Sequence, residues 1–212
     1  MAATDIALQA VILLLTLAMF IALQYFPKQA LNRLRTKNRT ALQSNRHFLQ
    51  STQFLSKAKS TSSKSQSQTL AKNALLEAET AITLSPRDPA PLILKALALD
   101  LLGHKASAVK SLDLALSAPR VNSLSDRDRG DALVKRGELK MAVNRRRRVD
   151  SAIEDLEEAV RLSGESERVF CLLGQCYESK GVKEEARLAY EKALKAHPKS
   201  VLALEGLGRL GL

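Results

Sequence analysis

The sequence predicts an all-α protein, a short α-solenoid of about three two-helix repeats plus flanking helices behind an N-terminal transmembrane helix. The composition is the first observation behind this prediction, because hydrophobic residues make up 45% of the 212 residues but aromatic residues only 4%. An apolar content made mostly of Ala and Leu favours helices over a β-sandwich or barrel. The other two observations are an apolar run near the N-terminus and small residues that recur with a period of 34.

The apolar run covers Ile6–Leu23, interrupted only by Gln9 and Thr16, and it extends to Phe26. Because about 20 helical residues cross a hydrocarbon core of about 30 Å, this length is enough for one span. The segment lacks the basic start and the small-residue cleavage site of a signal peptide. We therefore expect residues 1–26 to form an uncleaved anchor that contacts the lipid bilayer through residues 6–26 and ends before Pro27.

The net charge of +11 is concentrated beside this run, since residues 27–72 hold ten Lys and Arg and no Asp or Glu. Lys and Arg close to a span stay on the cytosolic side. We therefore expect a single-pass membrane protein whose C-terminal domain is cytosolic. The pattern is similar to that of signal-anchored receptors in mitochondrial and plastid outer membranes, and it also fits the endoplasmic reticulum.

Residues 27–68 are expected to form a basic juxtamembrane stalk. Its apolar residues recur irregularly, so a cationic amphipathic helix on anionic lipid and a solvated helix or loop both fit. The stretch from Lys57 to Gln68, KAKSTSSKSQSQ, is Ser-rich and without periodicity. Such a composition predicts a flexible tether.

Residues 69–212 are expected to form the helical repeat domain. Ala74, Ala108, Ala152 and Ala186 are spaced 34, 44 and 34 residues apart. Two further columns keep the same spacing: Ala81, Ala115, Ala159 and Ala193, and between them Ala78, Leu112, Leu156 and Tyr190. The ten extra residues of the middle interval are assigned to turns, within Val121–Arg129 and around Asn144–Arg148. Thr69–Leu84 supplies only a second helix, whose partner is either degenerate or the stalk itself.

The segment Glu167–Ser200 has small residues where two helices must approach closely, and it has Gly181 at the turn between them. It resembles a tetratricopeptide repeat at nearly every signature position, with Phe170 in place of the usual Trp. The resemblance covers the repeat domain and is strongest in this last unit. The residues expected to pack the repeats are Ala108, Ala152, Phe170, Gly174, Tyr177, Ala186, Tyr190, Ala193 and Pro198.

Catalysis finds little support in the sequence, so we expect no enzyme and no cofactor. The three His residues lie in different segments, in no triad or metal-ligand spacing. Cys171 and Cys176 project in different directions from one helix and are interpreted as packing residues. The run Arg145–Arg148 is interpreted as a solvated turn balanced by downstream acids rather than a phosphate or nucleic-acid contact, so nucleic acid is disfavoured as a partner.

The family resemblance implies a concave wall of first helices that binds other proteins, as a peptide segment or a helix. The groove positions carried over from the family include Ile93, Leu97, Asp100, Val134, Glu138, Met141, Arg168, Gln175 and Glu178. Repeats that hold the acidic tails of heat-shock chaperones carry a Lys, Asn and Arg clamp. Here Ile93 and Leu97 stand where its first Lys and Asn are expected, which disfavours that role. We expect a membrane-anchored adaptor or receptor; the alternative is a structural or assembly subunit of a larger membrane complex.

Overall fold

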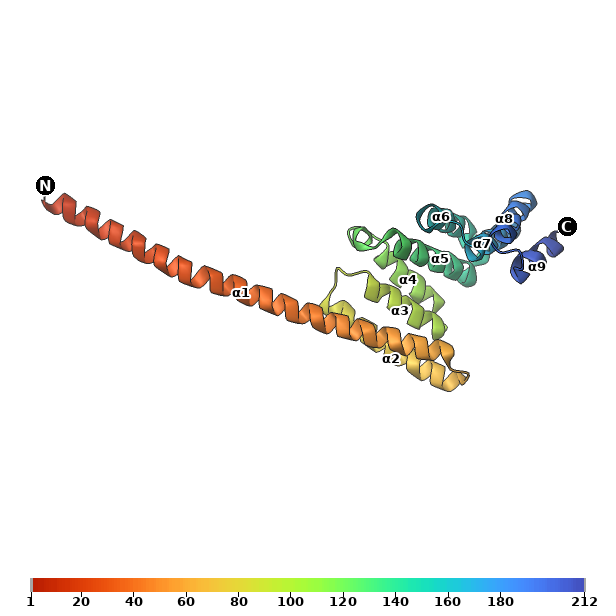
Figure 1. Cartoon of the computed structure of the whole chain (residues 1–212), viewed down its shortest axis with the longest axis horizontal. Helices are drawn as coiled ribbons and strands as arrows, with labels where there is room; N and C mark the ends of the chain where they lie inside the picture. Colours follow the sequence, from red (N-terminus) through yellow and green to blue (C-terminus); the bar gives the residue numbers. More distant parts are fainter. Residues whose placement is uncertain (1, 212) are drawn as a thin grey trace. The chain divides into compact units, whose positions relative to one another are not determined.

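The computed structural model describes the backbone of residues 2–211, and the side chains of residues 9–22 and 39–211. Every regular element in this part of the chain is helical, and it contains no strand. In chain order the elements are α1 (Ala2–Ser60), α2 (Lys64–Leu84), α3 (Ala90–Leu101), α4 (Lys105–Ala115), the 3-10 turn η1 (Arg120–Ser123), α5 (Asp126–Val143), α6 (Arg145–Ser163), α7 (Glu167–Lys180), α8 (Lys183–Ala196) and α9 (Val201–Leu210) (Figure 1). The chain divides into two units, Met1–Gln43 and Ser44–Leu212.

The first unit contains residues 1–26, for which the sequence predicts a membrane anchor, and the structure differs from that prediction. Within residues 6–26, the side chains of residues 6–8 and 23–26 lie outside the described residues, and those of residues 9–22 are mostly exposed and apolar. Pro27 does not end the helix, because α1 continues to Ser60. In the described part of the chain, no helix combines the length and the apolar character that a bilayer crossing requires. The single-pass membrane localisation is therefore wrong on this finding, and the expected anchor at residues 1–26 is not supported; the predicted lipid contact of residues 6–26 stays a prediction.

The second unit begins with a helical hairpin in which the last turns of α1, residues 44–60, pack against α2. The Ser51 hydroxyl donates a hydrogen bond of 2.8 Å to the carbonyl oxygen of Ala74, and the Ser44 hydroxyl donates one of 3.2 Å to that of Ala81. Because the partner numbers fall as those of α1 rise, the two helices are antiparallel. The buried side chains of α2 in this hairpin are all Ala, which lets the helix axes approach closely: Ala71, Ala74, Ala78 and Ala81.

This hairpin differs from the expected stalk and tether. The compact unit starts at Ser44 rather than at residue 69, and within Lys57–Gln68 only Thr61–Ser63 lies between helices. Ser63 caps α2, because its hydroxyl accepts a hydrogen bond from the backbone N–H of Gln66. The serines thus act as caps and as hydrogen-bond donors to carbonyl groups, which their composition alone does not show. The helix partner of Thr69–Leu84 was expected to be either a degenerate first helix or the stalk itself. The structure shows the second alternative, because residues 44–60 of the predicted stalk pack against α2.

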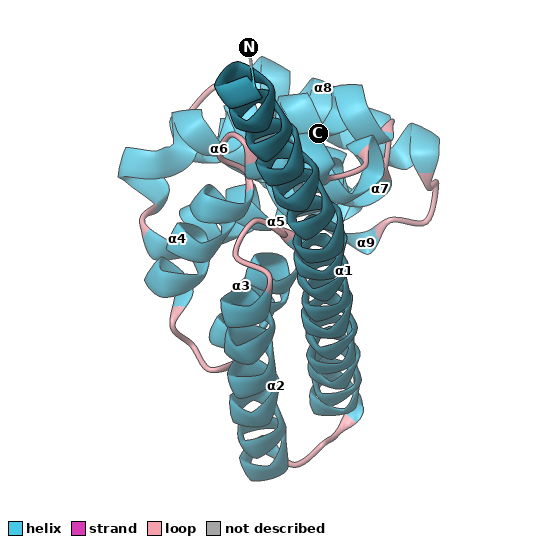
Figure 2. Cartoon of the chain, turned by 90° about the vertical axis from the view of Figure 1, so that its left-hand side faces the viewer, coloured by secondary structure: helices cyan, strands magenta, loops and turns pink. Residues whose placement is uncertain are grey.

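Three further hairpins follow, α3–α4, α5–α6 and α7–α8, and α9 packs on the last of them. Short loops join the successive helices (Figure 2). The three columns of the sequence repeat lie on α2, α4, α6 and α8, and all twelve side chains are fully buried. The packing is consistent with the prediction that these positions form the repeat contacts. Because one member of each column lies on α2, this helix corresponds to the second helix of a repeat, with the end of α1 as its first helix.

The insertions of the middle repeat lie only partly where turns were expected. Residues 120–123 form η1, which overlaps the predicted insertion. At the other site, however, Asn144 alone separates α5 from α6, and Arg145–Arg148 form the first turn of α6. The Asn144 side chain accepts a hydrogen bond of 3.1 Å from the backbone N–H of Arg147 and thereby caps the N-terminus of α6. This helix therefore begins at Arg145, within the segment that was expected to be a turn. The extra residues there lengthen the two helices instead of their turn.

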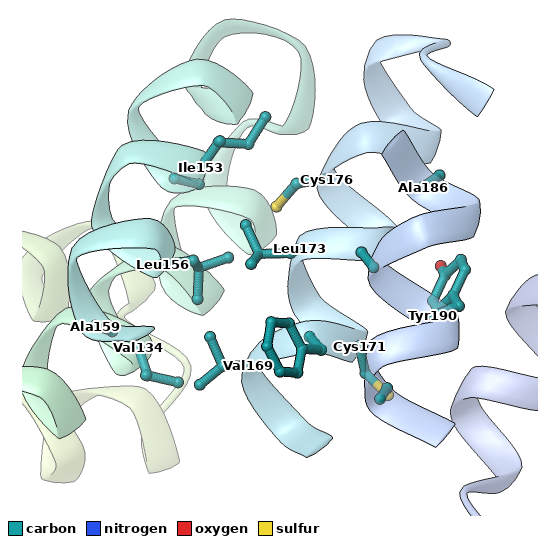
Figure 3. Close-up of a cluster of buried hydrophobic side chains, with 14 of the residues drawn as sticks. Val134, Ile153, Leu156, Ala159, Val169, Cys171, Leu173, Cys176, Ala186 and Tyr190 are labelled. Carbon is teal, nitrogen blue, oxygen red and sulfur yellow. The ribbon is translucent and has the colours of Figure 1, made fainter. Parts of the chain in front are cut away.

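The packing residues of the last repeats form one continuous core. Leu156 and Leu173 point toward one another between α6 and α7 (Figure 3). Phe170 and Tyr190 are buried in the same core, whereas Tyr177 is only half-buried. Pro198 is exposed after the end of α8, so it follows the helix end rather than packing the repeat. Gly181 ends α7 with a φ of 82°, as its expected place in a turn requires.

Candidate protein-binding groove

A groove of about 990 Å³ runs along the second unit, beside the first helices of the hairpins. Its walls come from the last turns of α1, from α3, α5 and α7, from the end of α6, and from the loops before α5 and α7. The apolar part of the lining is contributed by Phe48, Ala90, Ile93, Leu94, Leu97, Leu124, Ala132, Val134, Leu162 and Val169. The polar part is contributed by Lys59, Arg127, Asp128, Asp131, Lys135, Ser163, Ser166 and Arg168. We call this set of residues the concave groove.

The structure brings four of the predicted binding residues together in the concave groove: Ile93, Leu97, Val134 and Arg168. Glu138, Met141 and Gln175 line a separate hollow of about 170 Å³ among α5, α6 and α7. Asp100 and Glu178 line neither space, and both form ion pairs with residues of neighbouring helices. The predicted set therefore divides into a groove group, a hollow group and two residues engaged in interhelical contacts.

A chain of ion pairs links three first helices beside the concave groove. Lys135 of α5 lies 2.7 Å from Asp100 of α3 and 3.2 Å from Glu138 one turn along α5. Glu138 in turn lies 2.6 Å from Arg168 of α7. The Lys135 side chain is only 18% exposed, so its two carboxylate neighbours offset much of the cost of burying its charge. The cations at these positions are thus already paired within the protein.

Sequence reasoning missed the contribution of α1 to the groove, made by Phe48 and Lys59. A signal for it is present in the spacing of the small residues Ser44, Ser51 and Ala58, which recur every seven residues and are all buried. Such a repeat indicates a helix face that packs against another helix. The stretch was instead interpreted as a basic stalk and tether, because it has no acids and many serines.

Glu178 anchors α9 to α7. Its carboxylate accepts hydrogen bonds of 2.8 and 2.9 Å from Arg209 and one of 2.8 Å from the Tyr190 hydroxyl. The bonds from Arg209, together with that from Tyr190, outweigh partial burial and lower the pKa of Glu178 below its ordinary value. Burial, with the Glu178 hydrogen bond and charge, raises the pKa of Tyr190. Glu178 therefore holds the end of the solenoid in place.

A second ionic cluster lies inside the α5–α6 hairpin, around Asp155. Its carboxylate, 6% exposed, accepts hydrogen bonds of 2.9 and 2.6 Å from Arg136 and lies 2.7 Å from Lys140. Burial lowers the pKa of Arg136, but the hydrogen bonds and charges of Asp155 and Asp113 outweigh it, so that the net change is upward. Both cations are mostly buried, and the cluster stabilises the contact between the two helices.

The remaining reactive groups are embedded in packing. Cys171 and Cys176 are free, buried thiols, and burial raises the pKa of Cys176 to about 12. A thiol with such a pKa is a poor nucleophile at neutral pH. Among the described residues, no three His, Cys, Asp or Glu side chains are grouped as a metal site requires.

Comparison with known proteins agrees with this architecture. Residues 142–201 match the family described as Tetratricopeptide repeat. The fold is a tetratricopeptide-repeat-like α-solenoid. A comparison with curated protein sequences found no match.

Several solved structures share the fold. A crystal structure of MamA superposes with a TM-score of 0.64 at 17% identity, over 79% of this chain and 80% of that chain. YrrB, described as a TPR protein with an unusual peptide-binding site, has a TM-score of 0.56 at 18% identity, over 68% of this chain and 73% of its own. A thermophilic TPR protein of Thermus thermophilus has a TM-score of 0.52 at 23% identity, over 85% of this chain and 98% of its own. At these identities the likeness concerns the fold alone.

Proposed function

We propose that the protein is an adaptor that binds a segment of another protein in the concave groove. One observation carries the proposal: successive first helices combine apolar side chains into a groove of about 990 Å³. Stacked helical repeats commonly use such a surface to hold an extended segment or a helix. As an adaptor the protein acts by binding, without a catalytic step.

The lining favours a partner segment with apolar anchors. Ile93 and Leu97 lie one helical turn apart on α3, and Val134 faces the same groove from α5. Apolar side chains of a partner would lose contact with water there, and polar groups such as Asp131 would set orientation. The peptide-binding site named for YrrB supports this kind of partner by analogy of fold.

An acidic tail is a poor candidate for the same groove. Lys135 and Arg168, which line it, already pair with Asp100 and Glu138. A partner carboxylate would have to displace these internal carboxylates, and the displaced groups would then lack their partners. The paired cations therefore favour neutral, apolar anchors over a carboxylate clamp.

The test is a selection of random dodecapeptides, displayed on phage, against the full chain. We expect enrichment of peptides with apolar residues, and binding about tenfold or more weaker to a Leu97→Gln variant, because a polar side chain there disrupts the apolar lining. Leu114→Gln is the matched control, since Leu114 is exposed on α4 and does not line the groove. Circular dichroism melts establish that both variants fold. Equal binding to both variants, or no enrichment, would contradict the proposal.

A second candidate function is that of a permanent subunit in a larger assembly. Val201, Leu202 and Leu204 are exposed on α9, and such side chains are often covered in stable complexes. A permanent subunit would be purified with its partners in fixed stoichiometry and retain them in high salt, as measured by light scattering after size-exclusion chromatography. An adaptor would instead release its clients under these conditions.

A further inference from the structure

The first turn of α6 carries four consecutive arginines, Arg145–Arg148, of which the first three are exposed and the last is half-buried. Among the described residues, none of the four guanidinium groups lies within ion-pairing distance of a carboxylate. Asp150, the nearest acid along the chain, pairs instead with Lys180 at 2.7 Å. Within the described part of the chain, the cluster is therefore a concentrated positive charge with no internal ion pair; its internal electrostatic contact with a carboxylate is that of Arg145, which helps to lower the pKa of Glu178.

The position of the cluster increases this imbalance. A helix N-terminus already carries a partial positive charge, so acidic residues are preferred there. The two helices that pack against α6 have acids in their first turns, α5 and α7, whereas α6 has none, like α2, α3, α4 and α9. The helix dipole and four like charges therefore raise the local potential together, and an external anion would lower it.

One member of the cluster, Arg145, also lines a hollow of the protein. This is the hollow of about 170 Å³ among α5, α6 and α7, which Arg145 lines together with Met141, Leu172 and Gln175. Glu138 lines the same hollow and pairs with Arg168, which lines the concave groove. An anionic ligand of Arg145 would thus meet apolar and amide groups, and also the Glu138 carboxylate, whose charge is offset by Lys135 and Arg168.

We propose that Arg145–Arg148 bind an acidic segment, rich in Asp or Glu, of a protein partner. The apolar lining and the Gln175 amide suit a peptide, whose backbone and side chains offer both kinds of group. Nucleic-acid binding favours an extended basic surface with aromatic side chains for stacking, but this cluster occupies one helical turn and the hollow has no aromatic lining. The inference rests on the proposed function only in taking the partner to be a protein.

The experiment measures the binding of fluorescein-labelled hexaglutamate to the full chain by fluorescence anisotropy, with hexaglutamine as the neutral probe. Replacing all four arginines by Gln removes the charge and keeps a good helix former. The matched control replaces four exposed lysines elsewhere, which changes net charge equally: Lys105→Gln, Lys110→Gln, Lys195→Gln and Lys199→Gln. We expect hexaglutamate to bind about tenfold or more weaker to the arginine variant, with little change in the control. Binding should also weaken as salt is raised.

Three outcomes would overturn the inference: no binding of hexaglutamate, equal weakening in both variants, or tighter binding of a single-stranded RNA hexamer through the same arginines. Thermal melts of both variants confirm that each is folded before binding is compared. The groove variant Leu97→Gln separates the two proposals. Both proposals hold if Leu97→Gln still binds hexaglutamate but no longer binds the apolar peptides. Only the present inference fails if the arginine variant binds hexaglutamate as tightly as the native chain does and the native chain binds the apolar peptides.

Discussion

The ring of Tyr190 occupies the space that a side chain at Gly174 would need. A Cβ atom added at Gly174 would lie 2.5 Å from Cε1 of the Tyr190 ring, and Gly206 of α9 meets the same ring. Tyr190 is fully buried, so α7, α8 and α9 are held together around one aromatic side chain. The two glycines are required by this close approach rather than by their backbone angles.

Replacing either Gly174 or Gly206 by Ala should destabilise the second unit by about 1 to 3 kcal/mol, because the added methyl group forces the buried Tyr190 ring to move. Gly208→Ala is the control on α9: its Cβ would meet open space, so the better helix propensity should stabilise by about 0.5 to 1 kcal/mol. Urea denaturation measures the three free energies of unfolding. Equal effects at Gly206 and Gly208 would contradict the role of the ring.

Removing the carboxylate of Asp155 should cost about 3 to 5 kcal/mol of unfolding free energy, since Arg136 and Lys140 would remain as poorly compensated, mostly buried cations. Asp150→Ala is the control, because the Asp150–Lys180 pair is exposed and such pairs contribute about 0 to 1 kcal/mol. Urea denaturation of Asp155→Ala beside this control checks the prediction. A loss below that range in Asp155→Ala would show that water solvates the two cations.

The end of α1, residues 44–60, is expected to contribute to the hydrophobic core and therefore to the free energy of unfolding. Leu55 is 4% exposed in the hairpin with α2, so Leu55→Ala should destabilise by about 2 to 5 kcal/mol through lost burial and an unfilled cavity. Leu49, earlier on the same helix, is exposed, and Leu49→Ala should change stability by about 0.5 kcal/mol or less. Guanidinium denaturation compares the two. Similar small effects would mean that the hairpin does not form part of the cooperative unit.

The lowered pKa of Glu178 predicts how the stability of the fold changes with pH. Its pKa in the folded protein is lower than the ordinary value of 4.5, so ionised Glu178 stabilises the fold above that value. This contribution is lost as the pH falls through the folded pKa. Glu178→Gln should therefore be less stable than the native chain at neutral pH, and the difference should shrink in acid.

Thermal melts between neutral pH and about pH 3 measure this difference. Glu184→Gln is the control, because Glu184 is largely exposed and contacts only Arg187 on its own helix. A difference for Glu178→Gln that stays constant across the acid range would show that its ionisation does not stabilise the contact with α9.

The repeat architecture was predictable because the same contact recurs. Ala108, Ala152 and Ala186 lie wherever the second helix of a hairpin packs closely, and each is fully buried. A small side chain is required at every such contact, so the requirement appears as a period in the sequence. The concave positions Ile93, Leu97 and Val134 followed from the same register, and the structure brings them into one groove.

Other features depend on contacts between residues that no period relates. Whether Lys135 and Arg168 are free depends on Asp100 and Glu138, which reach them only after three helices have stacked. The serines of α1 are polar by composition, yet Ser51 is buried because a carbonyl oxygen of α2 accepts its hydrogen bond. The chain thus specified its helices and their repeat through local periodicity, whereas charge pairing and the extent of the core arose from packing between distant segments.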